Sequence, residues 1–384
     1  MRLTDIKAGV VGVGFIGVAH VEALRRLGVE VGGVVGSSPE RARAKAESED
    51  LPQVYDSLDA MLADPEIDVV HVASPNYAHA EQALAVMAAG KHVVCEKPLG
   101  LTSAETAGLI TTADEAGVVN AVCFNIRFYP LNHQMQAMVA DDEIGTPMFV
   151  TGSYLQDWLL LDTDWNWRLI HDQAGVLRAV ADIGSHWLDL ARFVTGQNVV
   201  EVMADLHTFV EVRRHPVGPV ETFASEVSDA DLIEETMSSD DGAGILLRFD
   251  GGARGMVAVS QVSAGRKNSV SIEVDGSESA VSWNSETPDH LWIGHRGRPN
   301  EILPRDPSLM SEAAAGVARY PGGHVEGYPD TFRALFGEVY RDIADGGPSA
   351  TPTYPTFADG HDALLVTEAV ARSSAEQRWV KVER

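Results

Sequence analysis

The chain has 384 residues, of which 45% are hydrophobic and 22% are charged, which suits a globular protein of about two or three domains. Lys and Arg total 29 against 56 Asp and Glu, and the net charge of −27 argues against a nucleic acid or an anionic membrane as partner. The longest apolar stretch, residues 8–19, contains four glycines and is too short for a membrane span, which takes about 20 apolar residues. Cys95 and Cys123 lie in apolar runs and suit buried free thiols, so we expect a cytoplasmic protein.

Residues 6–124 predict strands that alternate with helices, since short apolar runs are separated by stretches with helical spacing or helix caps. We expect strands at 6–13, 29–36, 68–73, 92–95 and 118–124. We expect helices at 17–27, 39–46 and 78–88, and a fourth that Thr102 or Ser103 caps and Gly117 ends. This alternation indicates a doubly wound sheet of parallel strands.

After about residue 125 the pattern changes to longer alternating runs, which predict an antiparallel or mixed sheet with one covered face. We expect strands at 149–154, 199–212, 244–249, 253–262, 269–274 and 379–382, and helices at 131–140, 181–194 and 359–373. Residues 213–219 and 348–355 contain Pro and Gly and predict loops. The sequence thus predicts two domains, 1–124 of the α/β class and 125–384 of the α+β class.

Residues 12–17 form the motif G-x-G-x-x-G, directly after a predicted strand and directly before a predicted helix. Glycines at this spacing allow a tight turn, close approach of a pyrophosphate to backbone N–H groups, and close packing of the helix on the strand. The alternative is a glycine-rich turn with no ligand. We expect a dinucleotide here, bound by Gly12, Gly14, Phe15, Ile16 and Gly17.

The end of the second predicted strand distinguishes the two nicotinamide cofactors. An acidic residue there bonds the adenosine ribose hydroxyls of NAD and disfavours the 2′-phosphate of NADP. Here Gly36 is followed by Ser37 and Ser38, with Arg41 close behind, so hydroxyls and a guanidinium are available for a phosphate. We therefore expect NADP, with NAD as the second choice. Alternatively, the serines form a turn and a helix cap, and Arg41 is solvated.

Glu96, Lys97 and Pro98 end the fourth predicted strand, at the carboxyl edge of the sheet where doubly wound folds bind ligands. Pro98 disfavours the α conformation for Lys97, which gives the lysine side chain a fixed direction. A lysine at this edge can hydrogen-bond a substrate oxygen. The alternative is a surface lysine paired with Glu96.

Asp182 and His186 form the pattern D-x-x-x-H within a predicted helix, so the two side chains share one helix face. A carboxylate beside an imidazole orients the ring and raises its basicity, as a general base needs. The alternative is an intrahelical ion pair. We expect no metal site, because other histidines such as His171 show no ligand spacing to this pair. The opposite face carries apolar residues at core spacing, namely Ile183, Trp187, Leu190 and Val194.

Residues 156–168 hold three of the seven tryptophans, Trp158, Trp165 and Trp167, interleaved with Asp, Asn and Arg. Sugars present apolar C–H faces rimmed by hydroxyls, so indole rings beside carboxylates and amides suit them. We expect Trp158 and Trp165 to bind a sugar and Trp167 to contact the cofactor. The alternative is that these tryptophans are core or dimer contacts.

Together these motifs resemble the Gfo/Idh/MocA oxidoreductase family, named for glucose-fructose oxidoreductase and inositol dehydrogenase. The resemblance covers nearly the whole chain. Its motifs are G-x-G-x-x-G at 12–17, A-S-P-N-x-x-H at 73–79, A-G-K-H-V-x-C-E-K-P at 89–98, W-R at 167–168 and D-I-x-x-H at 182–186. Membership implies a Rossmann domain followed by a domain with a large, open, mostly antiparallel sheet that often makes oligomer contacts.

The resemblance also implies roles for single residues. The catalytic set matches Lys97, Asp182 and His186. We expect the cofactor to be lined further by Ser37, Ser38, Arg41, Ser74, Pro75, Asn76, His79, Glu96, Lys97, Asn125, Trp167 and Arg168. We expect the substrate to be bound by Lys97, Arg127, Trp158, Trp165, Asp182 and His186. The stretch 36–42 is similar to NADP-using members such as 1,5-anhydrofructose reductase.

We therefore expect an NADP(H)-linked oxidoreductase that interconverts a hydroxyl and a ketone on a sugar, polyol or keto-sugar. His186, oriented by Asp182, takes the hydroxyl proton, and Lys97 stabilises charge on the same oxygen. We also expect a homodimer or homotetramer that forms through the C-terminal sheet. Three alternatives stay open: a redox-assisted glycosidase that recycles its nicotinamide, a dehydrogenase of a non-sugar alcohol, and a non-catalytic ligand-sensing regulator.

Overall fold

A computed structural model describes residues 1–217 and 232–384, which form two compact units. Neither unit is a contiguous piece of the chain, in contrast to the predicted segments 1–124 and 125–384. Unit 1 contains Met1–Asn125, Asp172–Gly175 and Pro329–Leu364. Unit 2 contains Ile126–His171, Val176–Tyr328 and Leu365–Arg384.

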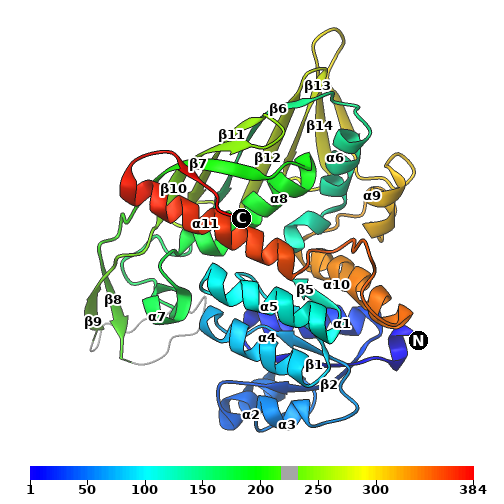
Figure 1. Ribbon diagram of the computed structural model, residues 1–384, viewed down its shortest axis with the longest axis vertical. Coiled ribbons are helices and arrows are strands. Elements are labelled where there is room, and N and C mark those ends of the chain that lie inside the picture. The colour runs from blue at the N-terminus through cyan, green and yellow to red at the C-terminus, as the bar shows by residue number, and fades with distance from the viewer. Residues whose placement is uncertain (218–231) are drawn as a thin grey trace. The chain divides into compact units, whose positions relative to one another are not determined.

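Unit 1 is built on a parallel sheet with the strand order β2-β1-β3-β4-β5, as the strand and helix alternation predicts. Helices α4 and α5 pack side by side (Figure 1). The strands are β1 (Lys7–Val11), β2 (Glu30–Val35), β3 (Val69–Val72), β4 (His92–Cys95) and β5 (Asn120–Val122). The helices are α1 (Phe15–Leu27), α2 (Pro39–Ser48), α3 (Leu58–Leu62), α4 (His79–Ala88), α5 (Ser103–Ala116) and α10 (Tyr328–Asp345).

Helix α5 shows how local chemistry sets these bounds. The Thr102 hydroxyl accepts the backbone N–H of Glu105 at 3.3 Å, and Gly117 ends the helix with a φ of 62°. A glycine adopts this left-handed conformation without steric cost, so both predicted ends of the helix are confirmed.

Helix α10 was not predicted, although its apolar residues recur at helical spacing. The Tyr340 hydroxyl lies 2.8 Å from Nε2 of His71 on β3, so the helix packs against the parallel sheet. The rings of Phe332 and Phe336 pack against the imidazole of His20. A segment more than 200 residues beyond β5 thus completes the core of unit 1.

Unit 2 is built on a large mixed sheet with the strand order β15-β14-β13-β12-β6-β11-β10-β7-β16. Strand β11 runs parallel to β6, and the other neighbours pair antiparallel, as the alternating runs predict. The strands are β6 (Pro147–Leu155), β7 (Val199–His207), β10 (Gly242–Phe249), β11 (Arg254–Ser260), β12 (Ser269–Gly276), β13 (Ser279–Asn284), β14 (His290–His295), β15 (Glu301–Pro304) and β16 (Val380–Lys381). Its helices are α6 (Pro130–Ala140), α8 (Ser185–Thr195) and α9 (Glu312–Val317). Helix α7 (His171–Ala174) belongs to unit 1 from Asp172 on, and α11 (Phe357–Glu376) is divided between the units after Leu364.

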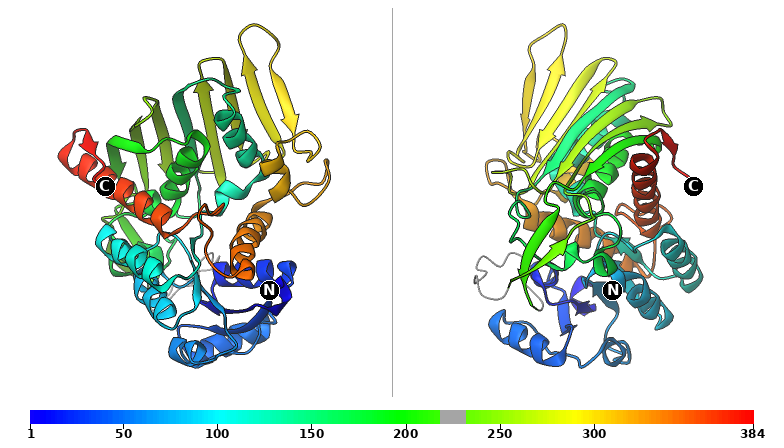
Figure 2. Two further views of the ribbon diagram at one scale, coloured as in Figure 1. Left: turned by 45° about the vertical axis from the view of Figure 1, so that its right-hand side comes forward. Right: turned by 90° about the vertical axis from the view of Figure 1, so that its left-hand side faces the viewer.

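One face of this large sheet is covered by helices, among them α6 and α8 (Figure 1 and Figure 2). Along β10 the inward residues Ile245 and Leu247 are buried, while Leu246 between them stays 45% exposed. The indole of Trp187 on α8 is fully buried and donates its N–H to the carbonyl oxygen of Ser271 at 2.8 Å. The predicted one-sided sheet is therefore confirmed.

The predicted loop at 213–219 is wrong over most of its length. Strand β8 (Val212–Pro216) pairs antiparallel with β9 (Leu232–Thr236) and forms a separate two-stranded ribbon. The partner strand supplies hydrogen bonds that the local sequence does not reveal, and Pro216 lies at the end of the strand where a missing N–H is tolerated. Residues 218 and 219 lie outside the described residues.

No helix within residues 1–217 and 232–384 has the length and apolar character that a membrane crossing requires.

Candidate active site

The glycine motif forms a turn that two backbone contacts close. Gly12 has a φ of +103°, and a Cβ there would lie 2.3 Å from the carbonyl oxygen of Ala73. A Cβ on Gly17 would lie 1.9 Å from the carbonyl oxygen of Gly12. Around Gly14, by contrast, a Cβ would meet no atom within 4 Å among the described residues. The turn is therefore closed toward the protein and open toward a ligand at the N-terminus of α1, which fits a dinucleotide pyrophosphate.

The side chains beside this turn leave the edge of the sheet accessible. Phe15 is the first residue of α1 and is 55% exposed, and Ile16 is half-buried. After β3, Ser74 and Pro75 are both half-buried, and the Ser74 hydroxyl donates to Oε1 of Gln82 at 2.6 Å. These residues lie at the carboxyl ends of β1 and β3, as the motifs predict.

The residues after β2 that we expect to contact a phosphate differ in their surroundings. Ser38 caps α2, since its hydroxyl accepts the backbone N–H of Arg41 at 3.3 Å. Hydrogen bonds from its own backbone and from Ser38 lower the pKa of Glu40, which ties that carboxylate to the cap. Ser37 and Arg41 are exposed, and the Arg41 guanidinium has no ion-pair partner among residues 1–217 and 232–384. The cap alternative is thus confirmed for Ser38 alone.

Three further residues expected at the cofactor are buried and hydrogen-bonded within unit 1. Nδ2 of Asn76 donates to the carbonyl oxygen of Ala174 at 3.3 Å, and Nδ2 of Asn125 donates to the Thr331 hydroxyl at 2.8 Å. Each ring nitrogen of His79 lies 2.7 Å from a carbonyl oxygen, those of Ser74 and Pro98.

Burial lowers the pKa of His79, whereas the two carbonyl oxygens favour the doubly protonated ring, because each of them can only accept. The imidazole bridges the chain after β3 and the chain after β4. His79 therefore positions the segments around the cofactor edge, and its own nitrogens are already in use.

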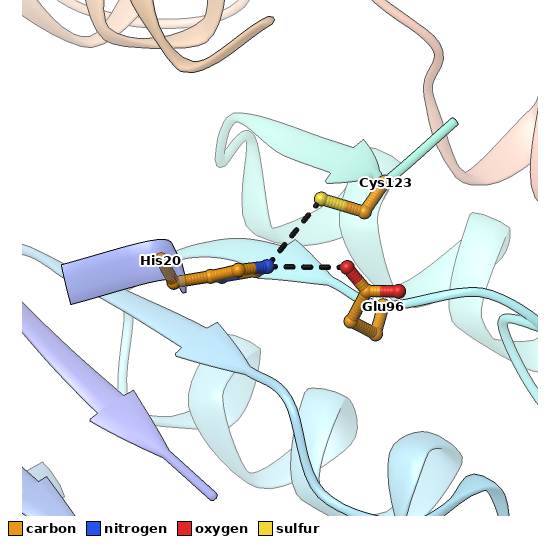
Figure 3. A group of neighbouring side chains, drawn as sticks. All are labelled: His20, Glu96 and Cys123. Atoms are coloured by element: carbon orange, nitrogen blue, oxygen red, sulfur yellow. Dashed lines mark hydrogen bonds and ion pairs between the residues drawn. The ribbon is translucent and has the colours of Figure 1, made fainter. Parts of the chain in front are cut away.

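Glu96 and Lys97 follow β4 directly, and their surroundings form a buried polar cluster (Figure 3). Nε2 of His20 lies 3.1 Å from Oε1 of Glu96 and 3.7 Å from Sγ of Cys123. The backbone N–H of Lys97 donates to Oε2 of Glu96 at 3.2 Å. The carboxylate of Glu96 therefore turns into the protein, and Lys97 is half-buried beside it.

This cluster continues away from the strand end. Nδ1 of His20 lies 3.0 Å from Nδ1 of His71, whose Nε2 lies 2.8 Å from the Tyr340 hydroxyl. His20, Glu96 and Cys123 offer three ligand atoms within 4.8 Å of one another, but hydrogen bonds already use both nitrogens of His20. Burial raises the pKa of the Cys123 thiol well above its usual value, which disfavours the thiolate that a metal needs.

The prediction that Asp182 and His186 lie on one regular α-helix is wrong. Residues 180–184 form a turn of π-helix, and α8 begins at Ser185. The extra residue of such a turn depends on backbone hydrogen bonds and has no signature in the apolar spacing. His186 is buried, and its ring centroid lies 6.2 Å from that of Tyr154.

Arg168 and Gln261 both contact the Asp182 carboxylate. Oδ1 pairs with Nε of Arg168 at 3.3 Å, and Oδ2 accepts from Nε2 of Gln261 at 2.9 Å. Gln261 is fully buried just beyond β11 and was not predicted, because a single glutamine at the end of a strand carries no sequence signal. Arg168, expected at the cofactor, pairs with the Asp182 carboxylate within unit 2.

The tryptophans of residues 156–168 occupy different environments. The guanidinium of Arg168 lies over the rings of Trp158 and Trp167, at 5.4 Å and 4.4 Å from their centroids. Trp165 is buried and stacks on His215, with ring centroids 3.6 Å apart. Trp165 thus fits the core alternative, whereas Trp158 and Trp167 flank the arginine that holds Asp182.

Arg127, expected to bind substrate, makes a two-point ion pair. Its Nε donates to Oδ2 of Asp189 at 2.7 Å, and its Nη2 pairs with the other carboxylate oxygen. The guanidinium also lies over the ring of Phe193. Arg127 is buried and fixes the chain before α6 to α8.

Comparison with known proteins agrees with this architecture. A model for the oxidoreductase family with an NAD-binding Rossmann fold matches residues 6–124, and one for the GFO/IDH/MocA C-terminal domain matches residues 132–282. The chain is 29% identical to levoglucosan dehydrogenase of Pseudarthrobacter phenanthrenivorans, over 99% of each chain. A solved structure of levoglucosan dehydrogenase with NADH and L-sorbose has a TM-score of 0.87 at 28% identity, over 99% of each chain.

An oxidoreductase domain protein from Kribbella flavida is similar too, with a TM-score of 0.87 at 30% identity, over 99% of this chain and 100% of that one. The chain belongs to the Gfo/Idh/MocA family of oxidoreductases, and the predicted resemblance is confirmed. It is an oxidoreductase that binds a nicotinamide dinucleotide at its Rossmann domain.

The glycine turn gives a matched pair of variants. Gly17→Ala should destabilise the fold by about 1–3 kcal/mol, because its methyl group would overlap the Gly12 carbonyl oxygen. Gly14→Ala should keep the melting temperature and weaken nicotinamide dinucleotide binding, because its methyl group would fill the space of the pyrophosphate. Thermal unfolding and fluorescence titration measure the two effects. Equal melting temperatures for both variants would contradict the close packing at Gly17.

Proposed function

We propose that the protein is an NADP(H)-dependent oxidoreductase that interconverts a hydroxyl and a ketone on a sugar or polyol. The observation that carries the proposal is the Asp182 carboxylate, held by Arg168 and Gln261 one helical turn before a buried histidine. The similarity to levoglucosan dehydrogenase along the whole chain supports the same class of substrate.

In the oxidative direction, His186 takes the proton of the substrate hydroxyl, and Asp182 keeps the imidazole oriented and favours its charged form. The Lys97 ammonium hydrogen-bonds the same oxygen and stabilises the negative charge that develops on it. The nicotinamide supplies hydride chemistry when bound. In the reductive direction, His186 returns the proton to the oxygen and Lys97 polarises the carbonyl.

Substrate recognition rests on the indole of Trp158 in this proposal. Trp158 is half-buried beside Arg168, so an indole face and a guanidinium lie together next to Asp182. The ring can stack on the apolar face of a sugar, and the charged groups can take its hydroxyls. Trp165 contributes as a support for this segment.

The exposed face of the large sheet suits contact between copies of the chain. Leu246 and Met256 are opposite each other on β10 and β11 and are 45% and 49% exposed. Phe149 on β6, opposite Arg254 two residues along β11, is 41% exposed. A patch of this kind favours a protein interface. We propose a homodimer or homotetramer through this face, in the cytoplasm, where the two buried thiols stay reduced.

A panel of sugars and polyols with NADP⁺ and NAD⁺, followed at the nicotinamide absorbance, tests the activity. The proposal predicts net reduction of NADP⁺ with at least one polyol or sugar. Hydrolysis of a glycoside without net change in NADPH would favour the redox-assisted glycosidase instead. Ligand binding without turnover would favour a sensing regulator.

The assignment of the general base gives a direct kinetic prediction. His186→Ala should lower kcat by about 10²–10⁴-fold, the usual contribution of a positioned acid or base, and leave NADP(H) affinity unchanged. His290→Ala, at an exposed position on β14, is the matched control. Turnover of the His186 variant close to that of the wild type would show that His186 is not the general base.

Cofactor choice is proposed from the exposed guanidinium of Arg41, which has no ion-pair partner in the described part of the chain. Charge-assisted hydrogen bonds contribute about 1.5–3 kcal/mol, so Arg41→Ala should weaken NADPH binding by roughly 10–150-fold and leave NADH unchanged. Arg43→Ala is the matched control, because Arg43 already pairs with Asp56 at 2.7 Å. Dissociation constants for both cofactors check this, and tighter NADH than NADPH binding in the wild type would overturn it. The NADH in the levoglucosan dehydrogenase structure makes that comparison necessary.

A side chain at position 36 would be crowded by α2. A Cβ on Gly36 would lie 2.8 Å from the Cβ of Ala42 on α2. A switch toward NADH by Gly36→Asp therefore requires Ala42→Gly in the same variant, so that α2 keeps its place beside β2.

A further inference from the structure

Arg213 on β8 is fully buried, and its guanidinium is directed at the backbone of the tryptophan segment, residues 156–168. Nη1 donates to the carbonyl oxygen of Leu161 at 2.8 Å and to that of Asp164 at 3.2 Å. Nη2 donates to the carbonyl oxygen of Leu159 at 2.8 Å. One side chain thus ties together three carbonyl groups that belong to no helix or strand.

The same guanidinium is linked to the start of the helix that carries Asp182 and His186. Nη2 of Arg213 also donates to Oδ1 of Asp241 at 3.0 Å, and Arg178 pairs with that same carboxylate. The neighbouring Asp240 carboxylate accepts the backbone N–H of Arg178 at 2.6 Å and that of Val180 at 2.8 Å. We call Arg213, Asp241, Arg178 and Asp240 the buried arginine network.

The buried arginine network is also linked to Gln261, the second hydrogen-bond partner of Asp182. The backbone N–H of Gln261 donates to the carbonyl oxygen of Asp241 at 2.9 Å, and the carbonyl oxygen of Gln261 accepts the N–H of Leu159 at 3.2 Å. The side chain of Gln261 meanwhile holds Asp182. Displacing Asp241 therefore moves the tryptophan segment and the Asp182 carboxylate together.

The ribbon formed by β8 and β9 makes two more contacts with this segment. The backbone N–H of Arg214 donates to the carbonyl oxygen of Asp162 at 2.8 Å. His215 stacks on Trp165 with an interplanar angle of 8°, so three consecutive residues of β8 contact the same stretch of chain. A ribbon separate from the large sheet thus acts as a clamp on residues 159–165.

We propose that Arg213 is a positioning residue for substrate recognition. Through the buried arginine network it holds Trp158 and Arg168, which lie on either side of the clamped residues 159–165, in place beside Asp182. The proposal rests on the proposed function, in which these residues bind the sugar or polyol. Its effect is confined to unit 2, so cofactor binding at the glycine turn does not depend on it.

Two variants of Arg213 test this role. Arg213→Lys keeps the positive charge beside Asp241 but loses the planar guanidinium that donates to three carbonyl groups. Arg213→Met loses both the charge and these hydrogen bonds. We expect kcat/KM for the sugar to fall by about 10- to 100-fold, the cost of a misplacement near 1 Å, with the lysine variant less affected. The dissociation constant for NADPH should stay unchanged. Arg248→Met removes another arginine ion pair of unit 2, with Glu201, and is the matched control.

Amide hydrogen exchange of residues 156–168, measured without substrate, separates this inference from the proposed function. Faster exchange there in both Arg213 variants, and not in Arg248→Met, supports the clamp even if no sugar is turned over. Unchanged exchange overturns the clamp whatever the activity. A fall in NADPH affinity equal to the fall in sugar kcat/KM would also overturn it, since it would indicate general damage to the fold.

Discussion

The contact between Gly17 and the carbonyl oxygen of Gly12 sets the position of α1, and much of unit 1 follows from it. A methyl group at Gly17 would lie 1.9 Å from that oxygen, so the helix begins as close to β1 as the backbone allows. This approach brings His20 of α1 to 3.1 Å from Glu96 and thereby orders the strand end that carries Lys97. The glycine turn and the lysine that we propose as catalytic thus depend on the same backbone packing.

In unit 2 the position of the proposed catalytic carboxylate, Asp182, depends on side chains and not on close backbone packing. Asp182 lies at a π-helical turn, and long side chains from other segments hold its oxygens. Arg168, in a short 3-10 helix, and Gln261, in irregular chain beyond β11, each hold one oxygen of Asp182. Irregular backbone needs its carbonyl groups paired when it is buried. The Arg213 guanidinium donates hydrogen bonds to three of these carbonyl groups. The buried charges of the network therefore fix the positions of these segments more than they raise the free energy of unfolding.

The sequence predicts the parallel sheet, the glycine turn and both ends of α5, because each rests on local spacing or on a cap. It also predicts Trp187 as core, through apolar spacing. The clamp by Arg213 and the stacking of Trp165 on His215 escape prediction, since their partners lie about 50 residues apart in the chain. The π turn at Asp182 escapes it as well, because it changes backbone hydrogen bonds and not residue type. Ser38 is a position where the sequence suggests the wrong partner. Its hydroxyl suits a phosphate, but in the structure it caps α2.

We propose above all that Lys97 and His186 act on one substrate oxygen. A crystal structure of the protein with NADP⁺ and a sugar or polyol substrate measures this directly. The account predicts one substrate hydroxyl oxygen within about 3.2 Å of both Lys97 Nζ and a ring nitrogen of His186, with the hydroxyl-bearing carbon facing the nicotinamide ring. A substrate bound with its hydroxyls on Arg168 or Trp158 and none shared by Lys97 and His186 would contradict it.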